Sequence, residues 1–178
     1  LRPVDETARA TRRYHGDTFI LVTRWETSTG VAEVYDFLPM SRDGHLADAR
    51  VDLVRRVVGI SGTVEFEHDL RIRFDYSRSM PWMRQTGHDE PELIGVAGPD
   101  AIVLRGVALA DQERTHRGRH SVSAGEQQDV VLTWYPSHRP VPQPLHVANV
   151  VEFTQHWWQE WADKIQHEGP NRDKVVRS

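Results

Sequence analysis

Residues 63–76 read Thr-Val-Glu-Phe-Glu-His-Asp-Leu-Arg-Ile-Arg-Phe-Asp-Tyr, an almost unbroken alternation of polar and apolar side chains. A period of two predicts a β-strand, because successive side chains of a strand point to opposite faces of a sheet. At about 3.3 Å per residue this strand would span roughly 45 Å, well beyond the usual five or six residues. We therefore expect a large sheet with one buried face. The apolar face of the predicted strand comprises Val64, Phe66, Leu70, Ile72, Phe74 and Tyr76.

Shorter apolar runs on both sides of this stretch predict further strands, most of them joined by tight turns. Turn chemistry is clearest at Ser28-Thr29-Gly30, at Gly98-Pro99-Asp100 and at residues 123–126. Strands at this spacing favour an antiparallel β-sandwich over βαβ units. The predicted strands cover residues 18–26, 31–38, 51–58, 93–97, 101–105, 115–122 and 130–135.

Two connections complete this predicted order of strands. Residues 40–49, which include Ser41-Arg42-Asp43-Gly44, predict a loop before the strand over residues 51–58. Gly59-Ile60-Ser61-Gly62 predicts a turn from that strand into the long one, because glycine and serine are common turn residues.

The character of the chain changes after residue 137. Residues 138–144 contain three prolines and predict an extended linker. Residues 145–167 then predict an amphipathic helix, with Gly169-Pro170 as its stop signal. The apolar residues cover an arc of roughly 160°, against about 100° for a one-sided surface helix. Such a helix lies deeply on its own sheet, or it is clamped between the sandwich and a second body. The residues of this predicted interface are Val147, Val150, Val151, Trp157, Trp158, Trp161 and Ile165.

Composition excludes several kinds of site and partner. The 178 residues suit one domain with a proper core. The absence of cysteine excludes disulfides, thiolate metal sites and cysteine nucleophiles, and is consistent with a cytoplasmic location. A net charge of −4 does not resemble a nucleic-acid-binding domain, and no apolar run approaches the length of a membrane span. We therefore expect a cytoplasmic protein that binds neither nucleic acid nor membranes.

Histidines are numerous, but their spacing does not predict a metal site. His116 and His120 are four residues apart, and the arginines between them place positive charge where a metal ion would lie. We expect both to be surface histidines. His68 replaces an apolar residue on the buried face of the long strand, where we expect a hydrogen-bonded, partly buried side chain.

Carboxylates do not form a catalytic pair in this sequence. Hydrolysis of a glycosidic bond typically requires two carboxyl groups that face each other across the substrate. Glu65, Glu67 and Asp69 alternate as the residues of a solvated strand face do, and the acidic residues of the helix lie on its polar side. We expect no catalytic residue, no metal and no cofactor in this chain.

Aromatic and arginine residues gather at the end of the long strand. Tyr76, Arg78, Trp82 and Arg84 fall within nine positions. Aromatic faces stack on sugar rings, and guanidinium groups bind hydroxyl or carboxylate groups. Two interpretations remain open. Pro81 and Trp82 fold back to plug the end of the sandwich, or the four residues contact a substrate at its rim or a neighbouring domain.

Several short motifs, taken in order, resemble one family of enzymes. They are similar to the N-terminal, trehalase-like domain of glycoside hydrolase family 15, in its bacterial glucoamylase and trehalase branch. The tail Gly169-Pro170-Asn171-Arg172-Asp173 with Val175-Val176-Arg177-Ser178 resembles the entry into the first helix of that family's catalytic barrel. The resemblance covers nearly the whole chain. The remaining motifs are Trp25-Glu26-Thr27, Val34-Tyr35-Asp36-Phe37-Leu38-Pro39-Met40, Arg73-Phe74-Asp75-Tyr76-Ser77-Arg78 with Pro81-Trp82, Val96-Ala97-Gly98-Pro99-Asp100-Ala101, and Thr133-Trp134-Tyr135-Pro136-Ser137-His138.

The resemblance implies a β-sandwich that a linker helix joins to an (α/α)6 barrel, which carries both catalytic glutamates and inverts the anomeric centre. On this basis we expect a sandwich over residues 1–137 that is incomplete at its N-terminus, a linker and helix over residues 138–168, and the truncated start of the barrel over residues 169–178. The chain alone would be catalytically silent. Its partners would be the barrel and, through the barrel, an α-glucoside, while a homo-oligomer is left open.

Trehalose is the substrate that the resemblance favours for the whole enzyme, with glucoamylase activity as the alternative. A free-standing carbohydrate-binding sandwich, with Tyr76, Trp82 or Trp134 as its stacking platform, is a second hypothesis. A histidine-metal β-sandwich enzyme is a third.

Overall fold

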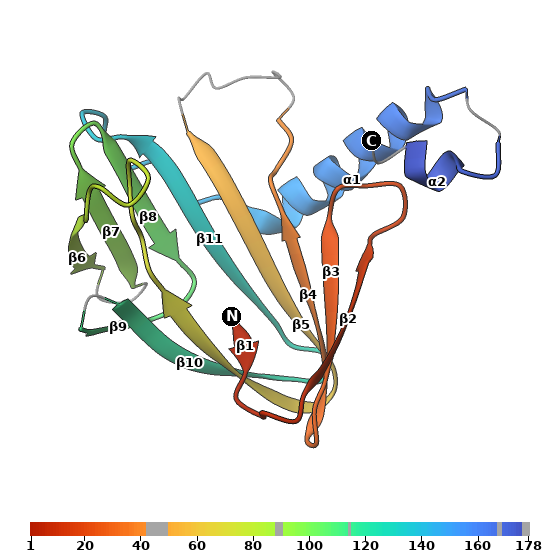
Figure 1. Cartoon of the computed structure of the whole chain (residues 1–178), viewed down its shortest axis with the longest axis horizontal. Helices are drawn as coiled ribbons and strands as arrows, with labels where there is room; N and C mark the ends of the chain where they lie inside the picture. The colour runs from red at the N-terminus through yellow and green to blue at the C-terminus, as the bar shows by residue number, and fades with distance from the viewer. Residues whose placement is uncertain (42–49, 88–90, 114, 167–168, 176–178) are drawn as a thin grey trace.

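The computed structural model describes residues 1–41, 50–87, 91–113, 115–166 and 169–175. These residues are mainly antiparallel β-structure with a long helix near the C-terminus, which confirms the predicted fold class (Figure 1). Residues 42–49 of the predicted loop, His167 at the predicted helix end and residues 176–178 of the tail lie outside the described residues. The elements are β1 (Arg2–Pro3), β2 (Arg9–Tyr14), β3 (Leu21–Glu26), β4 (Gly30–Phe37), β5 (Val51–Leu70), β6 (Trp82–Thr86), β7 (Glu92–Ala97), β8 (Asp100–Arg105), β9 (Ala110–Gln112), β10 (Thr115–Ser123), β11 (Gln127–Pro136), α1 (Val147–Asp163) and α2 (Arg172–Val175).

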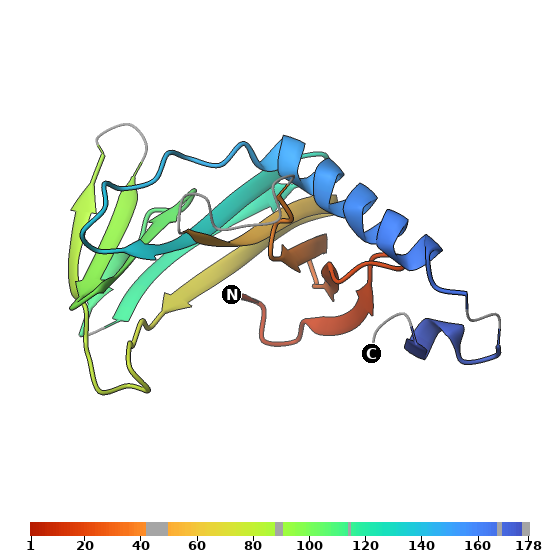
Figure 2. The ribbon, with the colours of Figure 1, turned by 90° about the horizontal axis from the view of Figure 1, so that it is seen from above.

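The 20-residue strand β5 belongs to two layers of sheet. Its first part pairs with β4 and β11, within the strand order β2-β3-β4-β5-β11-β8-β7-β6. Its last part pairs with β10 and β1, and β10 also pairs with β9. The two parts diverge, so that β9, β10 and the end of β5 form a second layer beside the larger one (Figures 1 and 2). Two of the three predicted hairpins are confirmed, as β3–β4 and β7–β8. The third prediction is wrong, because β10 and β11 flank the expected turn but pair with different parts of β5 and not with each other.

The prediction of a turn at residues 59–62 is wrong, because β5 continues through them. A Cβ atom at Gly59 would lie 2.0 Å from the Ser123 carbonyl oxygen, so a residue with a side chain does not fit there. Gly62 has a φ of +60°, and a Cβ atom there would lie 2.1 Å from the Thr29 carbonyl oxygen. The turn of the β3–β4 hairpin and the turn between β10 and β11 thus pack against β5 at this point, which we call the glycine crossing (residues 59–62). The glycines allow neighbouring backbones to approach β5 closely, and they do not reverse the direction of the chain.

The long strand also ends earlier than predicted, at Leu70 and not at Tyr76. Its neighbour β10 begins at Thr115, and the last pair between the two strands joins His116 to Leu70. Residues 71–73 are therefore outside the sheet, although polar and apolar side chains still alternate along them. Alternation indicates which face a side chain occupies, but it contains no information about where the partner strand stops.

The sandwich core lies between the two layers. One cluster joins Ala32 and Val34 of β4 to Val64 and Phe66 of β5, with Val122 of β10. A second cluster closes the other end of the sandwich, with Leu70 and Met83 packed against it. The buried members of this second cluster are Leu93, Leu104, Val107, Leu109 and Val130.

The outer face of the larger sheet is covered by the C-terminal segment. Helix α1 crosses it (Figure 2), and Val147 packs with Phe37, Val54 and Val131. Val141 of the linker packs on a further cluster around Tyr135. The helix covers residues 147–163 and not the predicted 145–167. It ends at Lys164, whose N–H bonds to the Trp161 carbonyl three residues back, a tightening typical of a last turn.

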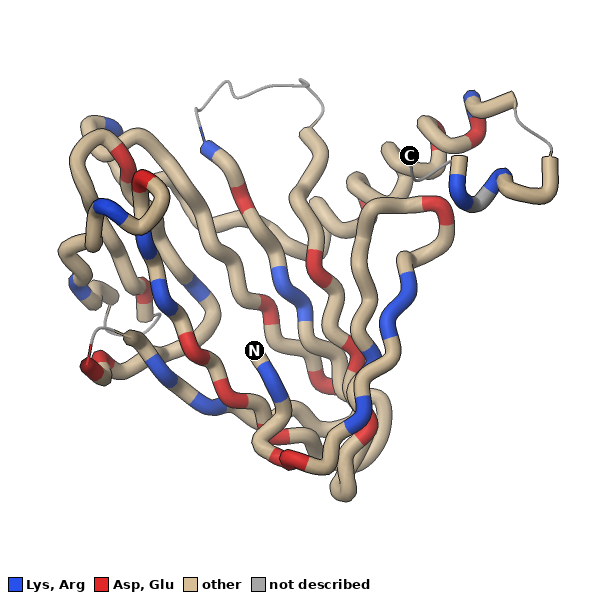
Figure 3. Tube along the Cα trace, in the orientation of Figure 1, with Lys and Arg blue, Asp and Glu red and all other residues tan. Residues whose placement is uncertain are grey.

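Four strands were not predicted from the sequence, namely β1, β2, β6 and β9. Strand β2 is exposed along its whole length and carries three arginines, as edge strands often do. Basic and acidic residues interleave along the strands (Figure 3). Within the described residues, no helix is both long and apolar enough to cross a membrane.

Candidate functional site

The segment between β5 and β6 forms a small hairpin of its own. Phe74 and Ser79 exchange two backbone hydrogen bonds, of 2.9 and 3.2 Å. Between them, Asp75, Tyr76 and Ser77 have positive φ angles of 46°, 51° and 71°. A non-glycine residue in this region costs about 1–2 kcal/mol, so three in succession require support from the hairpin bonds. The hairpin projects Tyr76, which is 97% exposed, into solvent.

The predicted rim residues do not converge on one point. Tyr76 and Arg78 lie in the hairpin, whereas Trp82 and Arg84 lie on β6, where the sheet order ends. Trp82 is 68% exposed, so the interpretation that it plugs the end of the sandwich is wrong. Burial raises the pKa of Tyr135, and the charge of Arg84 opposes that rise. A contact of the four residues with a substrate or a second domain stays a prediction.

A groove of about 290 Å³ runs beside this hairpin. Trp82 contributes to its lining, whereas Tyr76, Arg78 and Arg84 do not. Asp111 of β9 and His116 of β10 also line it, and they are direct partners across the two strands. These two residues were not predicted to lie beside Trp82, because they are about 30 positions further along the chain and only strand register places them there. The full lining is Leu70, Ile72, Arg73, Met80, Pro81, Trp82, Met83, Asp111 and His116.

One edge of helix α1 packs on its own sheet through small residues. Thr154 is fully buried, and its hydroxyl accepts a hydrogen bond of 3.0 Å from the Met40 N–H. Ala162 is also fully buried, and Val147 and Val151 pack on the cluster below. Thr154 and Ala162 were not predicted as contact residues. Their positions follow Val147 and Val151 at helical spacing, which is the signal that could have identified them.

Further along the helix lies an aromatic surface that we define as Tyr14, Phe19, Trp157, Trp158 and Trp161. The rings of Phe19 and Trp158 lie 4.5 Å apart between centroids, and Trp161 meets Trp158 edge-on at 5.6 Å. Tyr14, Phe19 and Trp161 are each about 40% exposed. The described residues therefore cover this aromatic surface only in part, and the predicted second body stays a prediction.

The other predicted helix contacts differ in burial. Val147 is buried, whereas Val150, Val151, Trp157, Trp158 and Ile165 are half-buried. The tryptophans are thus less covered than Thr154 and Ala162.

The prediction of a surface position for His120 is wrong. β10 pairs with β5, which places His120 on the face that carries Phe66 and His68, and its ring stacks on Phe66 at 5.6 Å. Nδ1 of His120 lies 2.8 Å from Nε2 of His68, a side chain that is 7% exposed. Burial lowers the pKa of both imidazoles, and the second ring adds to the effect on His68, whose pKa falls to about 4. His68 is hydrogen-bonded and buried, in line with its prediction.

A metal site finds no support around these rings. Within the described residues, no group of three or more His, Cys, Asp or Glu side chains is placed to hold a metal ion. Nε2 of His120 is buried and has no hydrogen-bond partner among the described residues. The two histidines are therefore a polar pair within the apolar core.

The carboxylates of β5 form ion pairs on a solvated face, as predicted. Arg2 holds the pKa of Glu67 below its ordinary value, and Arg71 does the same for Asp69, with Arg117 as a second partner. A general acid for glycoside hydrolysis requires a raised pKa. The environments of Glu67 and Asp69 therefore favour the ionised form and suit ion pairing.

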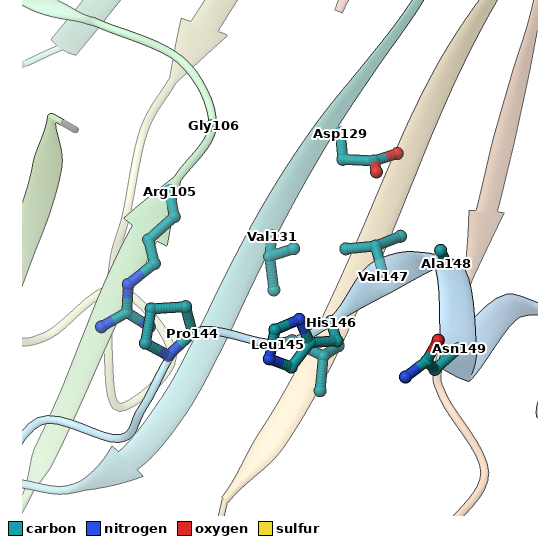
Figure 4. A pocket seen from close by; sticks show the side chains of 10 residues that line it. All are labelled: Arg105, Gly106, Asp129, Val131, Pro144, Leu145, His146, Val147, Ala148 and Asn149. Atoms are coloured by element: carbon teal, nitrogen blue, oxygen red, sulfur yellow. The ribbon is translucent and has the colours of Figure 1, made fainter.

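A second hollow, of about 350 Å³, lies where the linker enters α1 (Figure 4). Arg105 and Asp129 line it, but their charges are already paired. Arg105 donates to Glu92 and to the Pro142 carbonyl, and Arg56 holds Asp129 through two hydrogen bonds of 2.7 and 2.8 Å. The hollow is thus a structured junction between linker and sheet. Trp134 is held in a similar way, through a 2.9 Å hydrogen bond from Nε1 to Asp100, and is half-buried.

Comparison with known proteins relates the chain to glycoside hydrolases. No protein-family model matches it. Over 90% of its length it is 29% identical to a trehalase of Mycolicibacterium smegmatis and 27% identical to a trehalase of Mycobacterium tuberculosis. The chain spans only about a quarter of the length of these curated relatives. Among solved structures, a protein described as a kojibiose phosphorylase from the human microbiome aligns with 96% of this chain and 25% of its own, at a TM-score of 0.40 and 6% identity.

Proposed function

We propose that this chain is the non-catalytic β-sandwich domain of an inverting α-glucoside hydrolase of glycoside hydrolase family 15, and that the whole enzyme is a cytoplasmic trehalase. The observation that carries the proposal is the sequence likeness to two proteins named trehalase over 90% of the chain. The motifs that resemble the family are spread along nearly the same length of the chain. Glucoamylase is the alternative within the family, and it differs in substrate only.

The role of the domain is to brace a catalytic (α/α)6 barrel through the aromatic surface of α1. An exposed cluster of aromatic rings is unusual for a surface that faces water alone, and aromatic residues are enriched in the cores of protein interfaces. Trp157, Trp158 and Trp161 already have one side in contact with this chain. Their remaining area would be covered by the barrel, in line with a helix clamped between two bodies.

Hydrolysis of trehalose by the protein that carries this chain tests the proposal. Inversion means that water attacks one anomeric carbon from the face opposite the leaving oxygen, so that glucose is released as the β-anomer while the leaving glucose keeps the α-configuration. We expect equal amounts of α- and β-glucose at early times. Proton NMR measures the two anomers before mutarotation mixes them. Release of α-glucose alone would show retention, preference for maltose would favour glucoamylase, and inactivity on both sugars would overturn the proposal.

The brace is tested separately by Trp161→Ala. We expect this variant to lower the thermal midpoint of the whole enzyme by several degrees more than that of the 178-residue chain, because only the whole enzyme would bury the ring against a second body. Ile60→Ala is the matched control, since Ile60 is 44% exposed on β5, far from α1. Equal shifts for Trp161→Ala in the two proteins would rule out the brace.

A further inference from the structure

We propose that the groove between β6 and the β9–β10 hairpin binds the pyranose ring of a glucoside. This site goes beyond the proposed brace and shares no residue with it. The β6 end of the sheet and the C-terminal part of α1 lie on opposite sides of the molecule (Figures 1 and 2). The groove can therefore bind sugar whether or not the aromatic surface contacts a barrel.

One wall of the groove is aromatic and accessible. Trp82 is 68% exposed and Met80 is 53% exposed, although both are apolar and both line the groove. The floor includes Leu70 and Met83, which pack against the sandwich core. The C–H face of a pyranose ring is apolar and flat, so it stacks on an indole in the way that other apolar groups do.

The opposite wall is polar and is fixed by strand pairing. Asp111, His116 and Leu70 are successive partners across β9, β10 and β5. Side chains of paired residues project to the same side of a sheet, so the carboxylate and the imidazole stand together beside the apolar floor. A carboxylate accepts hydrogen bonds only, whereas a neutral imidazole offers one donor and one acceptor. Together they match adjacent sugar hydroxyls, each of which donates and accepts.

Arg73 adds donors to the mouth of the groove. Its Nη1 already donates to the Ile72 carbonyl oxygen at 2.6 Å, which fixes the guanidinium at this edge. The group carries five N–H donors, so donors remain for a ligand. An aromatic platform that faces a carboxylate, an imidazole and a guanidinium is a combination suited to sugars, because it serves both the C–H face and the hydroxyls.

The size of the groove fits one ring with an open end. Its volume of about 290 Å³ is at the lower limit of small-ligand sites, which is about 300 Å³. The hairpin at residues 74–79 connects two lining residues, Arg73 and Met80, and holds three residues at unfavourable positive φ angles. Strain of this kind commonly occurs at functional sites, which is consistent with a binding role for this end of the sandwich.

Saturation-transfer NMR with the 178-residue chain tests the site, with trehalose and maltose as probes at millimolar concentration. We expect transfer to the ring protons of both sugars, and none to mannitol, which has no ring face to stack. Trp82→Ala should lower the affinity about tenfold or more, as loss of a central tryptophan contact does. Trp161→Ala is the matched control, since it removes another exposed indole outside the groove, and it should leave binding unchanged.

A second variant covers the case in which Trp82→Ala disturbs the edge strand. Asp111→Asn keeps the size of an exposed side chain and removes its charge, and we expect it to weaken binding several-fold, because hydrogen bonds to a charged acceptor are stronger than those to a neutral amide oxygen. No transfer to trehalose or maltose would overturn the proposal. Equal transfer to mannitol, or binding that survives both variants, would overturn it as well.

Discussion

Gly62→Ala is expected to destabilise the chain far more than Gly98→Ala, although the two glycines have almost the same positive φ angle. Their φ angles are +60° and +59°, so the strain of a left-handed alanine is common to both. A Cβ atom at Gly62 would lie 2.1 Å from the Thr29 carbonyl oxygen and 2.9 Å from the Gly30 Cα atom, whereas no heavy atom lies within 4 Å at Gly98. The pair therefore separates backbone strain from the crowding at the glycine crossing.

The expected size of the difference follows from what must move. Left-handed strain alone costs about 1–2 kcal/mol, which is the loss expected for Gly98→Ala. At Gly62 the Thr29 carbonyl must also withdraw, which breaks its 3.1 Å hydrogen bond from the Thr63 N–H, and overpacking of this kind costs about 1–3 kcal/mol more. Urea unfolding of both variants measures the two losses. Losses within about 0.5 kcal/mol of each other would show that the glycine crossing is not crowded.

His68 is expected to make the folded chain sensitive to acid between about pH 6.5 and pH 4. Its pKa is lowered from 6.5 to about 4 by burial and by the neighbouring His120 ring. Between these values the unfolded chain binds a proton that the folded chain does not, so the free energy of unfolding falls as the pH falls. The contribution is complete above pH 6.5 and is lost progressively down to about pH 4. A protonated His68 would also face the positive charge of Arg55.

The size of this effect is measured by comparison with His68→Gln. Each unit of pKa shift corresponds to about 1.4 kcal/mol, so between pH 7 and pH 4.5 the wild-type chain should lose about 2 kcal/mol more than the variant. Glutamine keeps an amide donor for Nδ1 of His120 but does not titrate. His116→Gln, on the strand that carries His120, serves as the control and should behave as wild type. Identical pH dependence in wild type and His68→Gln would contradict the assignment.

Much of the architecture could be predicted because its signals are local. Alternation of side chains identified the strands, and turn residues such as Gly98-Pro99-Asp100 identified the hairpins. The short or exposed strands β2, β6 and β9 were missed, because their residues alternate poorly and are stabilised by pairing with a neighbour.

The candidate site was predicted only in part. Trp82 and the aromatic helix were identified from their residue types, since exposed and half-buried aromatic rings are candidates for contact in any fold. Asp111 and His116 were not assigned to a site with Trp82. The partnership of His68 with His120 was also missed, because it depends on the register between β5 and β10.

The sequence by itself determined the fold class, the β3–β4 and β7–β8 hairpins and the amphipathic helix, because these depend on periodicity and turn chemistry within a few residues. Only the tertiary structure decided how residues 59–62 behave, where β5 ends, and which side chains meet in the groove and in the histidine pair. Glycine signals both turns and close backbone approach, and alternation signals a face but not a partner. Those ambiguities are resolved by long-range strand register, which no local pattern contains.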